Sequence, residues 1–434
     1  MSYPGQMLVT MANVHRKDSH KLEVYRRHGG YKALEKAIKE IRPDDLIQMV
    51  KDSGLRGRGG AGFPTGMKWG FVPKSIPKPR YIVCNADEGE PGTFKDRVIL
   101  ENDPHLLIDG MLCTAWALES NRMFCYIRGE YGKSMRRMTD AVHEAYEAGL
   151  LGKNILGSGW DCDFDVYNGS GAYICGEETA LLDSLEGKRG HPRLKPPFPA
   201  VVGLYGCPTV VNNVETLATI PSIVERGAGW FAGTGVEKGT GPRIFAVSGH
   251  VEKPGCYELE LGKVTLRELI YEICGGIPRG RALKAVIPGG ASTPYLTADE
   301  IDCTLDFVGV ESKGSFMGSN GVIVMDDTTN IVRATLVLTR FFAHESCGQC
   351  TPCREGTHWA ERVLFRISGG KGSPEDVDLL LDLCSNMGGT TICALADGAV
   401  NPIRSSIQKF REDYDRLIRG EDGPVPGRLC EVVW

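Results

Sequence analysis

The sequence predicts a mixed α/β fold: an α/β sheet domain comes first, a small α+β module follows, and a helical bundle ends the chain. Three observations predict it. Strand-like runs alternate with helical stretches over residues 1–240, a turn-rich strand pattern covers 241–328, and amphipathic helices surround a cysteine motif in 329–434. Strands that alternate with helices are typical of a sheet covered by helices. A chain of 434 residues is long enough for several such domains, each with its own core.

The first region carries strand signals at residues 81–84, 124–127 and 164–167. Helical patterns at 105–118 and 133–147 separate them. This alternation predicts a sheet in which helices connect consecutive strands.

The middle region changes to shorter elements. Residues 243–248 and 256–261 read as two strands joined by a Pro-Gly turn, and 283–287 as a third. Between them, 265–274 has apolar residues at helical spacing and a glycine, Gly275, as its stop. The pattern predicts a small ββαβ module.

The last region predicts helices at residues 330–342, 354–367 and 375–383. Asn401 and Pro402 are expected to be the N-cap and the first-turn proline of a final helix. Apolar residues recur along that helix at steps of three and four, which predicts a core-facing stripe. The stripe consists of Val400, Ile403, Ile407, Phe410, Tyr414 and Leu417.

Composition narrows the functional classes. Fifty basic residues against 55 acidic ones give a net charge of −5, so no global field favours nucleic acid or an anionic membrane. No apolar run approaches the roughly 18–20 residues that a membrane-spanning helix needs, so membrane association is expected only through partners. Fifteen cysteines scattered through apolar runs, with no signal-peptide pattern at the start, predict a reduced, cytosolic chain.

The most informative motif is a group of cysteines. Cys347, Cys350 and Cys353 are spaced by two residues each, and Cys393 is a fourth candidate. Thiolates at this spacing with one remote partner suit the four-cysteine ligand set of a [4Fe–4S] cluster. A zinc site uses similar ligands, and buried cysteines also occur as plain packing residues. The spacing favours the cluster.

A glycine-rich segment at residues 57–66 contains a formal GxGxxG pattern. A dinucleotide-binding fingerprint follows a strand and opens a helix. Here a helical pattern at 44–51 precedes the glycines, and Pro64 and Gly66 are expected to prevent a helix from starting inside the segment. The segment therefore does not predict a Rossmann fingerprint.

The same segment still suits a phosphate or a planar ring, because residues without side chains let backbone N–H groups approach a ligand closely. Arg58 and Lys68 are expected to add positive charge there. The plain alternative is a flexible glycine loop.

Three further loops combine polar groups in the same region. Residues 85–92 follow the first strand with a cluster of acids, 169–179 places glycines and paired acids after another strand, and 212–216 supplies two amides. Carboxylates at the carboxyl end of a strand suit ribityl or ribose hydroxyls, and amides suit a heterocycle edge. An acidic surface turn is the alternative for 85–92. Together, the four segments favour a nucleotide or flavin pocket.

Five motifs carry a resemblance to a known family. They are LRGRGGAGFPTG (55–66), CNADEGEPG (84–92), GAYICGEET (171–179), RLKPPFP (193–199) and ESCGQCTPCREG (345–356). In this order, and over nearly the whole chain from Tyr25 to Leu417, they resemble the NADH-binding flavoprotein subunit of respiratory complex I. The resemblance implies an FMN-binding domain, a ubiquitin-like (SLBB, β-grasp) module and a four-helix bundle that carries one [4Fe–4S] cluster. The first twenty or so residues match nothing in it.

The resemblance also implies functional residues, motif by motif. The implied FMN contacts are Gly57, Arg58, Gly59, Gly60, Lys68, Asn85, Asp87, Glu88, Tyr173, Gly176, Glu177, Asn212, Asn213 and Thr216. The implied NADH contacts are Phe63, Phe71, Glu90, Glu178, Lys195 and Phe198. The implied cluster ligands are Cys347, Cys350, Cys353 and Cys393. Phenylalanine rings stack on adenine, and a carboxylate at the ribose favours NADH over NADPH.

The implied activity is NADH oxidation by hydride transfer to FMN, followed by single-electron transfer to the cluster. From there electrons are expected to pass toward quinone through partner subunits, namely a thioredoxin-like [2Fe–2S] subunit and the large iron–sulfur subunit of the peripheral arm. Glu90 is the candidate catalytic residue, either tuning the flavin or steering the nicotinamide. The expected location is the cytoplasmic side of the inner membrane, reached through these partners.

Two alternatives remain. The nearer is the diaphorase subunit of an NAD-dependent hydrogenase or formate dehydrogenase, whose members often add cysteine-rich segments at either end. Here no cysteine precedes Cys84 and only Cys430 follows Cys393, which favours complex I. The more distant alternative is a non-catalytic iron–sulfur or nucleotide-binding module.

Overall fold

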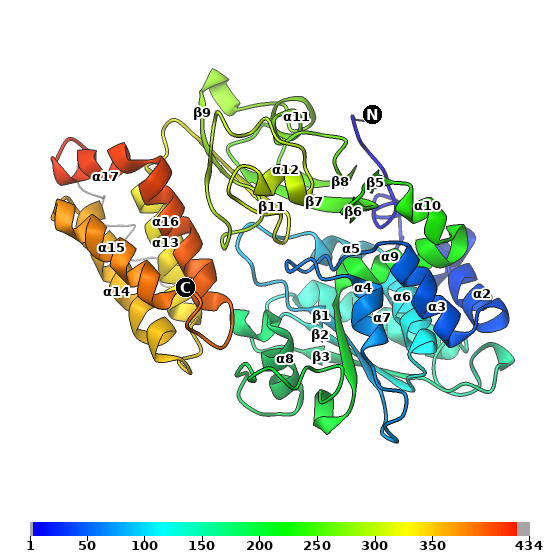
Figure 1. The fold of residues 1–434 in the computed structure, drawn as a ribbon. Helices are drawn as coiled ribbons and strands as arrows, with labels where there is room; N and C mark the ends of the chain where they lie inside the picture. Colours follow the sequence, from blue (N-terminus) through cyan, green and yellow to red (C-terminus); the bar gives the residue numbers. More distant parts are fainter. Residues whose placement is uncertain (1–2, 423–434) are drawn as a thin grey trace.

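A computed structural model describes residues 3–422 and divides them into three parts, so Cys430 lies outside the described residues. Figure 1 shows the parts: an α/β domain at the lower right, a strand-rich module above it, and a helical bundle at the left. The predicted α/β class, with its module and its bundle, is confirmed.

The α/β domain is built on a four-stranded parallel sheet of order β3-β2-β1-β4. The strands are β1 (Tyr81–Ala86), β2 (Arg122–Ile127), β3 (Asp163–Asn168) and β4 (Thr209–Asn213). The first three confirm the predicted strands. The fourth was not predicted, because its two asparagines read as part of a loop.

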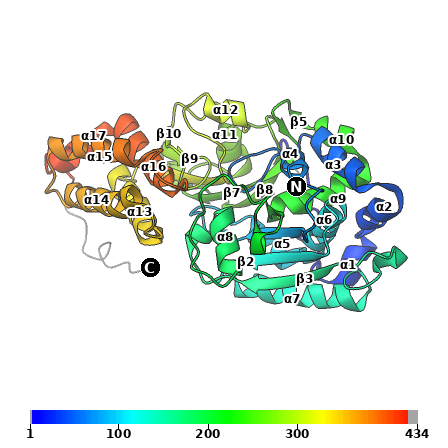
Figure 2. The ribbon, with the colours of Figure 1, turned by 60° about the horizontal axis from the view of Figure 1, so that its bottom comes forward.

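Both faces of this sheet are covered. Successive residues of β1 enter different cores: Ile82 and Cys84 pack into the larger one, and Val83 into another beneath α8. This alternation is what a strand with two buried faces requires. Helix α6 packs chiefly against α9 and α2 (Figure 2). The helices of the domain are α1 (Leu22–Arg27), α2 (Lys32–Glu40), α3 (Pro43–Asp52), α4 (Thr65–Gly70), α5 (Asp96–Asn102), α6 (Pro104–Ala117), α7 (Gly132–Glu147), α8 (Glu178–Leu185), α9 (Val214–Arg226) and α10 (Ala228–Ala232), with single turns η1 (Ile155–Gly157), η2 (Tyr173–Gly176) and η3 (Leu204–Gly206).

The second module is larger than the predicted ββαβ unit. Its five-stranded sheet has the order β10-β9-β11-β7-β8. The unpredicted central strand, β11, pairs parallel with β7 and antiparallel with β9, as a β-grasp arrangement requires. The strands are β7 (Pro242–Gly249), β8 (Gly255–Glu260), β9 (Leu283–Ile287), β10 (Leu296–Thr297) and β11 (Gly321–Asp326), and the helical segments are α11 (Leu266–Glu268), η4 (Leu269–Ile273), η5 (Pro278–Gly280) and α12 (Phe307–Glu311). A two-strand hairpin, β5 (Gly235–Val236) and β6 (Gly239–Thr240), precedes the module.

The bundle contains α13 (Ile331–Glu345), α14 (Thr351–Ser368), α15 (Pro374–Met387), α16 (Leu395–Lys409) and α17 (Arg411–Ile418). The predicted start of the last helix is wrong. Asn401 and Pro402 lie inside α16, which begins at Leu395, two residues after Cys393. A proline within a helix removes one backbone hydrogen bond and crowds the carbonyl of the preceding turn, and burial of this face, which includes Pro402 and Ile403, offsets that cost.

The predicted continuous stripe is also broken, since Phe410 has φ −133° and separates α16 from α17. Its role in the core is nevertheless confirmed: Ile403, Tyr414 and Leu417 are fully buried, and Phe410 is partly buried.

The N-terminal segment, for which the sequence predicted no role, joins the first two parts. Gln6 pairs with Leu259 at the edge of the β7–β8 sheet. The backbone N–H groups of Val9, Thr10 and Met11 all donate to the buried carboxylate of Glu258. The segment therefore stabilises the contact between the module and the sheet domain. Within residues 3–422, no helix is long and apolar enough to cross a membrane.

Candidate functional site

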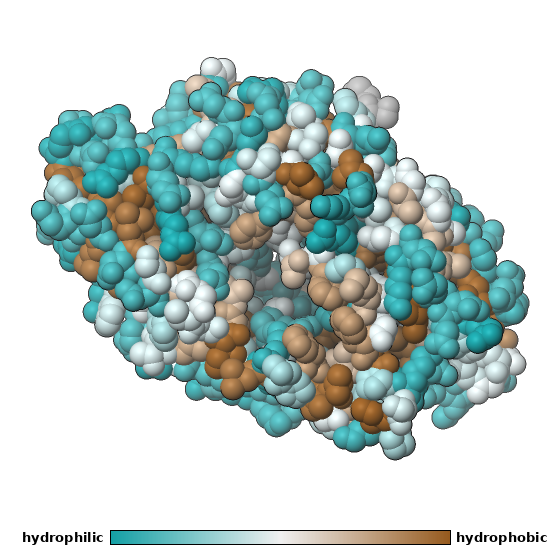
Figure 3. Space-filling view, viewed as in Figure 1, coloured by the Kyte–Doolittle hydropathy of each residue, from teal (hydrophilic) through white to brown (hydrophobic). Residues whose placement is uncertain are grey.

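A cavity of about 460 Å³ lies where the three parts of the molecule meet. The sheet domain contributes the carboxyl ends of β1 and β4, the module contributes two loops, and the bundle contributes the start of α16. In the space-filling view the molecule is hollowed between the module and the sheet domain (Figure 3). Parallel sheets commonly bind ligands at the carboxyl ends of their strands.

Eleven of the predicted flavin and nucleotide contacts line this cavity. They are Arg58, Gly59, Gly60, Asn85, Asp87, Glu88, Glu90, Tyr173, Gly176, Glu177 and Asn213. Four separate segments of the sequence therefore contribute to one wall, which the predicted nucleotide or flavin pocket requires.

The glycine-rich loop forms one side of the cavity. It is closed at its base by a bond from the Gly57 N–H to the Phe63 carbonyl, and it leads into α4 at Thr65. The expectation that no helix starts inside the segment is therefore wrong, because Pro64 supplies the extended residue that precedes the first turn of α4. Gly60 has φ +126°, and a side chain there would meet no atom within 4 Å. Its Cα faces open space, as a close approach by a ligand demands.

The prediction that Arg58 offers its positive charge to a ligand is wrong. Its guanidinium is completely buried and donates to the backbone carbonyls of Thr240 and Pro242. Burial, reinforced by the nearby Arg243, lowers the pKa of Arg58 to about 9. The side chain therefore ties the glycine loop to the second module, and it is its backbone that belongs to the cavity wall.

The acidic loop after β1 supplies three carboxylates with different surroundings. Asp87 is buried, its Oδ2 atom has no hydrogen-bond partner, and burial raises its pKa to about 7. Glu88 accepts from the N–H groups of Lys95 and Asp96 at the start of α5. Because that carboxylate is engaged by the helix, Asp87 is the acid with unmet hydrogen-bonding capacity.

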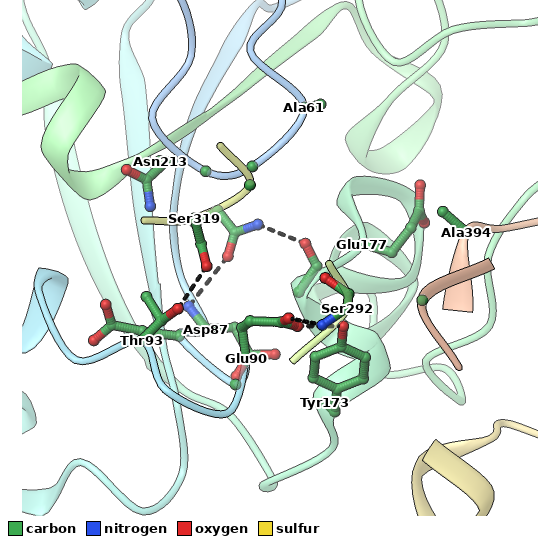
Figure 4. A pocket seen from close by; sticks show the side chains of 18 of the residues that line it. Ala61, Asp87, Glu90, Thr93, Tyr173, Glu177, Asn213, Ser292, Ser319 and Ala394 are labelled. Carbon is green, nitrogen blue, oxygen red and sulfur yellow. Dashed lines mark hydrogen bonds between the residues drawn. The ribbon is translucent and has the colours of Figure 1, made fainter. Parts of the chain in front are cut away.

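Glu90 has both carboxylate oxygens bonded (Figure 4). Oε2 accepts from the hydroxyl of Tyr173 at 2.7 Å, and Oε1 accepts from the backbone N–H of Ser292 at 2.7 Å. Burial raises the pKa of Glu90 above its ordinary value, and both bonds oppose that rise. The carboxylate is therefore fixed in position at the cavity.

The loop after β3 is fixed by hydrogen bonds of Glu177, the N-cap residue of α8. The Glu177 carboxylate accepts from the N–H groups of Thr179 and Ala180 at the start of α8, and its other oxygen accepts from Lys195 at 2.7 Å. The amide of Asn85 donates to the Gly176 carbonyl. These bonds join the acidic loop after β1 to the glycine-containing loop after β3.

A second group of predicted residues does not line the cavity. Phe63, Phe71 and Phe198 are exposed, at 46%, 55% and 57%, and the first two rings lie 6.2 Å apart. Phe63 and Phe71 thus present two neighbouring exposed rings. Lys68 pairs with Glu178 at 2.6 Å. Burial opposes ionisation of that carboxyl, but Lys68 and Lys195 hold its pKa below the usual value.

Three predicted FMN contacts are placed behind the cavity. Asn212 accepts from the indole N–H of Trp69, Thr216 accepts from the backbone N–H of Arg58, and Gly57 lies at the base of its loop. These residues stabilise the segments that form the cavity wall through their own hydrogen bonds.

Sequence reasoning missed several residues that line the cavity. The most prominent is Lys95, a buried ammonium that pairs with Asp96 at 2.7 Å and with Glu215 at 2.8 Å. Burial disfavours its charge, but the two carboxylates raise the pKa of Lys95 overall. Ser292 and Asn401 come from the module and from the bundle. The glycine tract around 289–290 was a usable signal for the first of these, whereas the sequence marked Asn401 only as a helix N-cap.

The four predicted cysteine ligands line a second, small cavity. Cys350 is the N-cap of α14, Cys353 lies in its first turn, and Cys393 precedes α16. Helix N-termini favour negative charge, so this placement suits thiolates. Over the described range, no three histidine, cysteine or acidic side chains approach closely enough to surround one metal ion.

The two cavities share a wall. Ile174, Cys393 and Leu395 line both of them. A ligand in the larger cavity and a group bound by the cysteines are therefore separated by one layer of side chains.

Comparison with known families agrees with this division. The family model described as the Nuo51 FMN-binding domain matches residues 50–222, the SLBB domain matches 243–310, and the NADH-ubiquinone oxidoreductase-F iron-sulfur binding region matches 333–417. The chain therefore contains an FMN-binding domain and a [4Fe–4S] region.

Curated relatives match over nearly their whole length. An F subunit of the NADH-quinone oxidoreductase of Rhizobium meliloti is 53% identical over 94% of this chain and 96% of its own. The corresponding protein of Streptomyces coelicolor is 54% identical over 94% and 90%. Among solved structures, a chain of an NAD⁺-reducing [NiFe]-hydrogenase is similar, with a TM-score of 0.81 and 35% identity over 95% of this chain and 67% of that one. The chain belongs to the family of NADH-quinone oxidoreductase F subunits, the NADH dehydrogenase flavoproteins that carry FMN and a [4Fe–4S] cluster.

Proposed function

We propose that this chain oxidises NADH with FMN bound in the 460 Å³ cavity and delivers the electrons to a cluster held by the adjoining cysteines. The observation that carries the proposal is the shared wall formed by Ile174, Cys393 and Leu395. A flavin and a cluster placed in these cavities need no further carrier between them.

The residues of the cavity fit FMN. Gly60 offers an open backbone face, and the unpartnered Oδ2 of Asp87 offers an acceptor to a ribityl hydroxyl. The Asn213 amide and the Lys95 ammonium supply polar and positive groups at the same wall. Unsatisfied buried polar atoms of this kind are rare without a ligand or water.

The second group of residues, which does not line the cavity, fits NADH. We assign Phe63, Phe71 and Phe198 to stacking on adenine, and Glu178 to the adenosine ribose. Lys68 and Lys195 keep that carboxylate ionised, so it accepts from ribose hydroxyls and disfavours a 2′-phosphate.

In the mechanism, FMN when bound supplies the acceptor for a hydride and the means to release two electrons singly. The protein supplies position. Glu90, held by Tyr173 and Ser292, steers the nicotinamide at the cavity. Cys347, Cys350, Cys353 and Cys393 hold the cluster.

The fuller assembly is also a proposal. The relatives' names place them in NADH-quinone oxidoreductase, and we propose that this chain joins a thioredoxin-like [2Fe–2S] subunit and the large iron–sulfur subunit on the cytoplasmic side of the inner membrane. We propose domain limits of 1–240, 241–328 and 329–434. The hydrogenase likeness leaves a diaphorase as the second candidate, although its sequence identity to this chain is lower than that of the quinone oxidoreductase relatives.

Anaerobic addition of NADH to the assembled enzyme tests the proposal. We expect the flavin absorbance to bleach and a reduced-cluster signal to appear in electron paramagnetic resonance. Bleaching without any cluster reduction, or an enzyme that lacks flavin, would overturn it.

A further inference from the structure

A loop of the second module covers Glu90 from one side. The Ala291 N–H donates to the Pro91 carbonyl, and the Ser292 N–H donates to the Glu90 carboxylate. Gly290 allows this approach, because a Cβ there would lie 2.6 Å from Cγ of Glu90 and the residue has φ +99°. Only glycine combines that backbone conformation with that proximity.

The bundle holds the same loop from the other side. The side-chain amide of Asn401, in α16, donates to the Ser292 carbonyl at 3.0 Å. Helix α16 packs closely here, since a Cβ on Gly398 would lie 3.1 Å from Cβ of Ser292. One peptide segment is thus bonded to the cavity carboxylate through its N–H and to the bundle through its carbonyl.

The opposite oxygen of Glu90 is fixed by Tyr173, whose backbone also contacts the bundle. The Tyr173 N–H donates to the Glu345 carboxylate at 2.9 Å, and its ring packs edge-on against Phe341. The bundle therefore supports Glu90 through two independent connections, one on each carboxylate oxygen.

We propose that Asn401 is a positioning residue for NADH: through the Ser292 peptide, it fixes the Glu90 carboxylate at the nucleotide site. The inference rests on the proposed function and adds a residue of the bundle that acts on Glu90 through the Ser292 peptide. Without the Asn401 amide, the Ser292 carbonyl loses its partner and the loop is free to withdraw its N–H from Glu90. The Ser292 N–H bond to the Glu90 carboxylate is charge-assisted, so its loss is expected to change substrate affinity about tenfold.

The test compares three substitutions in the assembled enzyme by NADH–ferricyanide kinetics. Asn401→Ala and Asn401→Asp both remove the donor, and the second keeps the shape of the side chain. We expect KM for NADH to rise about 5–20-fold in both while kcat stays within about twofold. Asn401→Gln keeps an amide donor and is expected to hold KM within about twofold of the wild type.

A matched control lies elsewhere in the bundle. Asn386 in α15 also donates its amide to a backbone carbonyl, that of Asp382, at an exposed site. Asn386→Asp should leave KM unchanged. All rates are normalised to bound FMN, so partial loss of flavin does not enter the comparison.

Unchanged KM in both Asn401→Ala and Asn401→Asp would overturn the inference. An equal rise of KM in Asn401→Gln would also overturn it, and so would a change confined to kcat. These outcomes leave the proposed function intact, because that depends on flavin content and cluster reduction in the wild-type enzyme.

Discussion

At the scale of single residues, backbone conformation can decide whether a residue contributes to the cavity wall, even where the side chain has no chemistry of its own. Gly60 carries no functional group, yet its φ of +126° and its open Cα face make it part of the cavity wall. We expect Gly60→Val to remove FMN, because the side chain would project into the cavity and the conformation would be strained. Flavin content of the purified enzyme measures this.

Gly229→Val is the matched control for that substitution. Gly229 is also free of contacts within 4 Å, but it lies on α10, away from the cavity, and has no positive φ. Normal flavin content in Gly60→Val, or equal loss in both variants, would show that the glycine loop does not contact the cofactor.

Glu178 gives a second test at this scale. Glu178→Gln removes the negative charge that Lys68 and Lys195 hold in place, so NADPH should be admitted better. We expect the ratio of kcat/KM for NADH over NADPH to narrow about tenfold. An unchanged ratio would contradict a contact between Glu178 and the adenosine ribose.

The sequence predicted which residues gather at the cavity better than it predicted what they do there. Asp87 and Tyr173 line it as expected. Arg58 does not present its charge, because its guanidinium binds the backbone carbonyls of Thr240 and Pro242, far along the chain. Local spacing identifies a residue type near a loop, but the side chain's direction depends on distant parts of the fold.

At the scale of elements, the turn and helix starts around the cysteines create the second cavity. Cys350→Ser and Cys393→Ser replace a thiolate by a harder oxygen donor, so the [4Fe–4S] signal should be lost or altered. Electron paramagnetic resonance of the NADH-reduced enzyme reports it. Cys384→Ala, a buried cysteine of α15 outside this cavity, should leave the signal unchanged. An unaltered signal in both serine variants would refute the ligand assignment.

Helix α6 provides a pH-dependent test of the N-terminal packing. His105 is fully buried, with Tyr31 and Glu144 on its two nitrogens, and burial lowers its pKa to about 4. The unfolded chain, with an ordinary pKa near 6.5, takes up this proton first as pH falls. This preferential protonation of His105 in the unfolded chain therefore destabilises the folded state progressively from about pH 6.5 to pH 4, by about 2 kcal/mol at pH 5.

Hydrogen exchange in the assembled enzyme measures that effect. Between pH 7.5 and pH 5, protection factors in α1 should fall more than about tenfold further in the wild type than in His105→Gln. The comparison isolates His105 because Asp103 and Asp109, whose buried carboxyls have raised pKa values, are present in both variants. Equal losses in both would show that His105 does not control the local stability.

The sequence predicted most elements but missed those that depend on distant partners. The periodicity of α13, α14 and α15 was sufficient to locate them. Strand β11 was missed because its stability comes from pairing with β7, which lies far earlier in the chain. The predicted start of α16 was too late because Pro402 resembled a first-turn proline. In the structure the helix begins at Leu395, and its first turns are largely buried.

At the scale of the whole molecule, the site exists only because three parts close on one cavity. Ser292 and Asn401 reach it from the module and the bundle, far along the chain from the β1 loop that they help to fix. Sequence motifs revealed the segments that contact cofactors. They could not reveal residues that act through another residue's position.

The central claim is that electrons leave the flavin cavity through the wall that it shares with the cysteines. The most direct measurement compares two rates in the assembled Cys350→Ser enzyme: NADH oxidation by ferricyanide, which takes electrons at the flavin, and NADH oxidation by quinone. With normal FMN content, we expect the ferricyanide rate to stay within about twofold of the wild type and the quinone rate to fall more than about tenfold. Quinone reduction that persists at the wild-type rate after the cluster signal is lost would contradict this route.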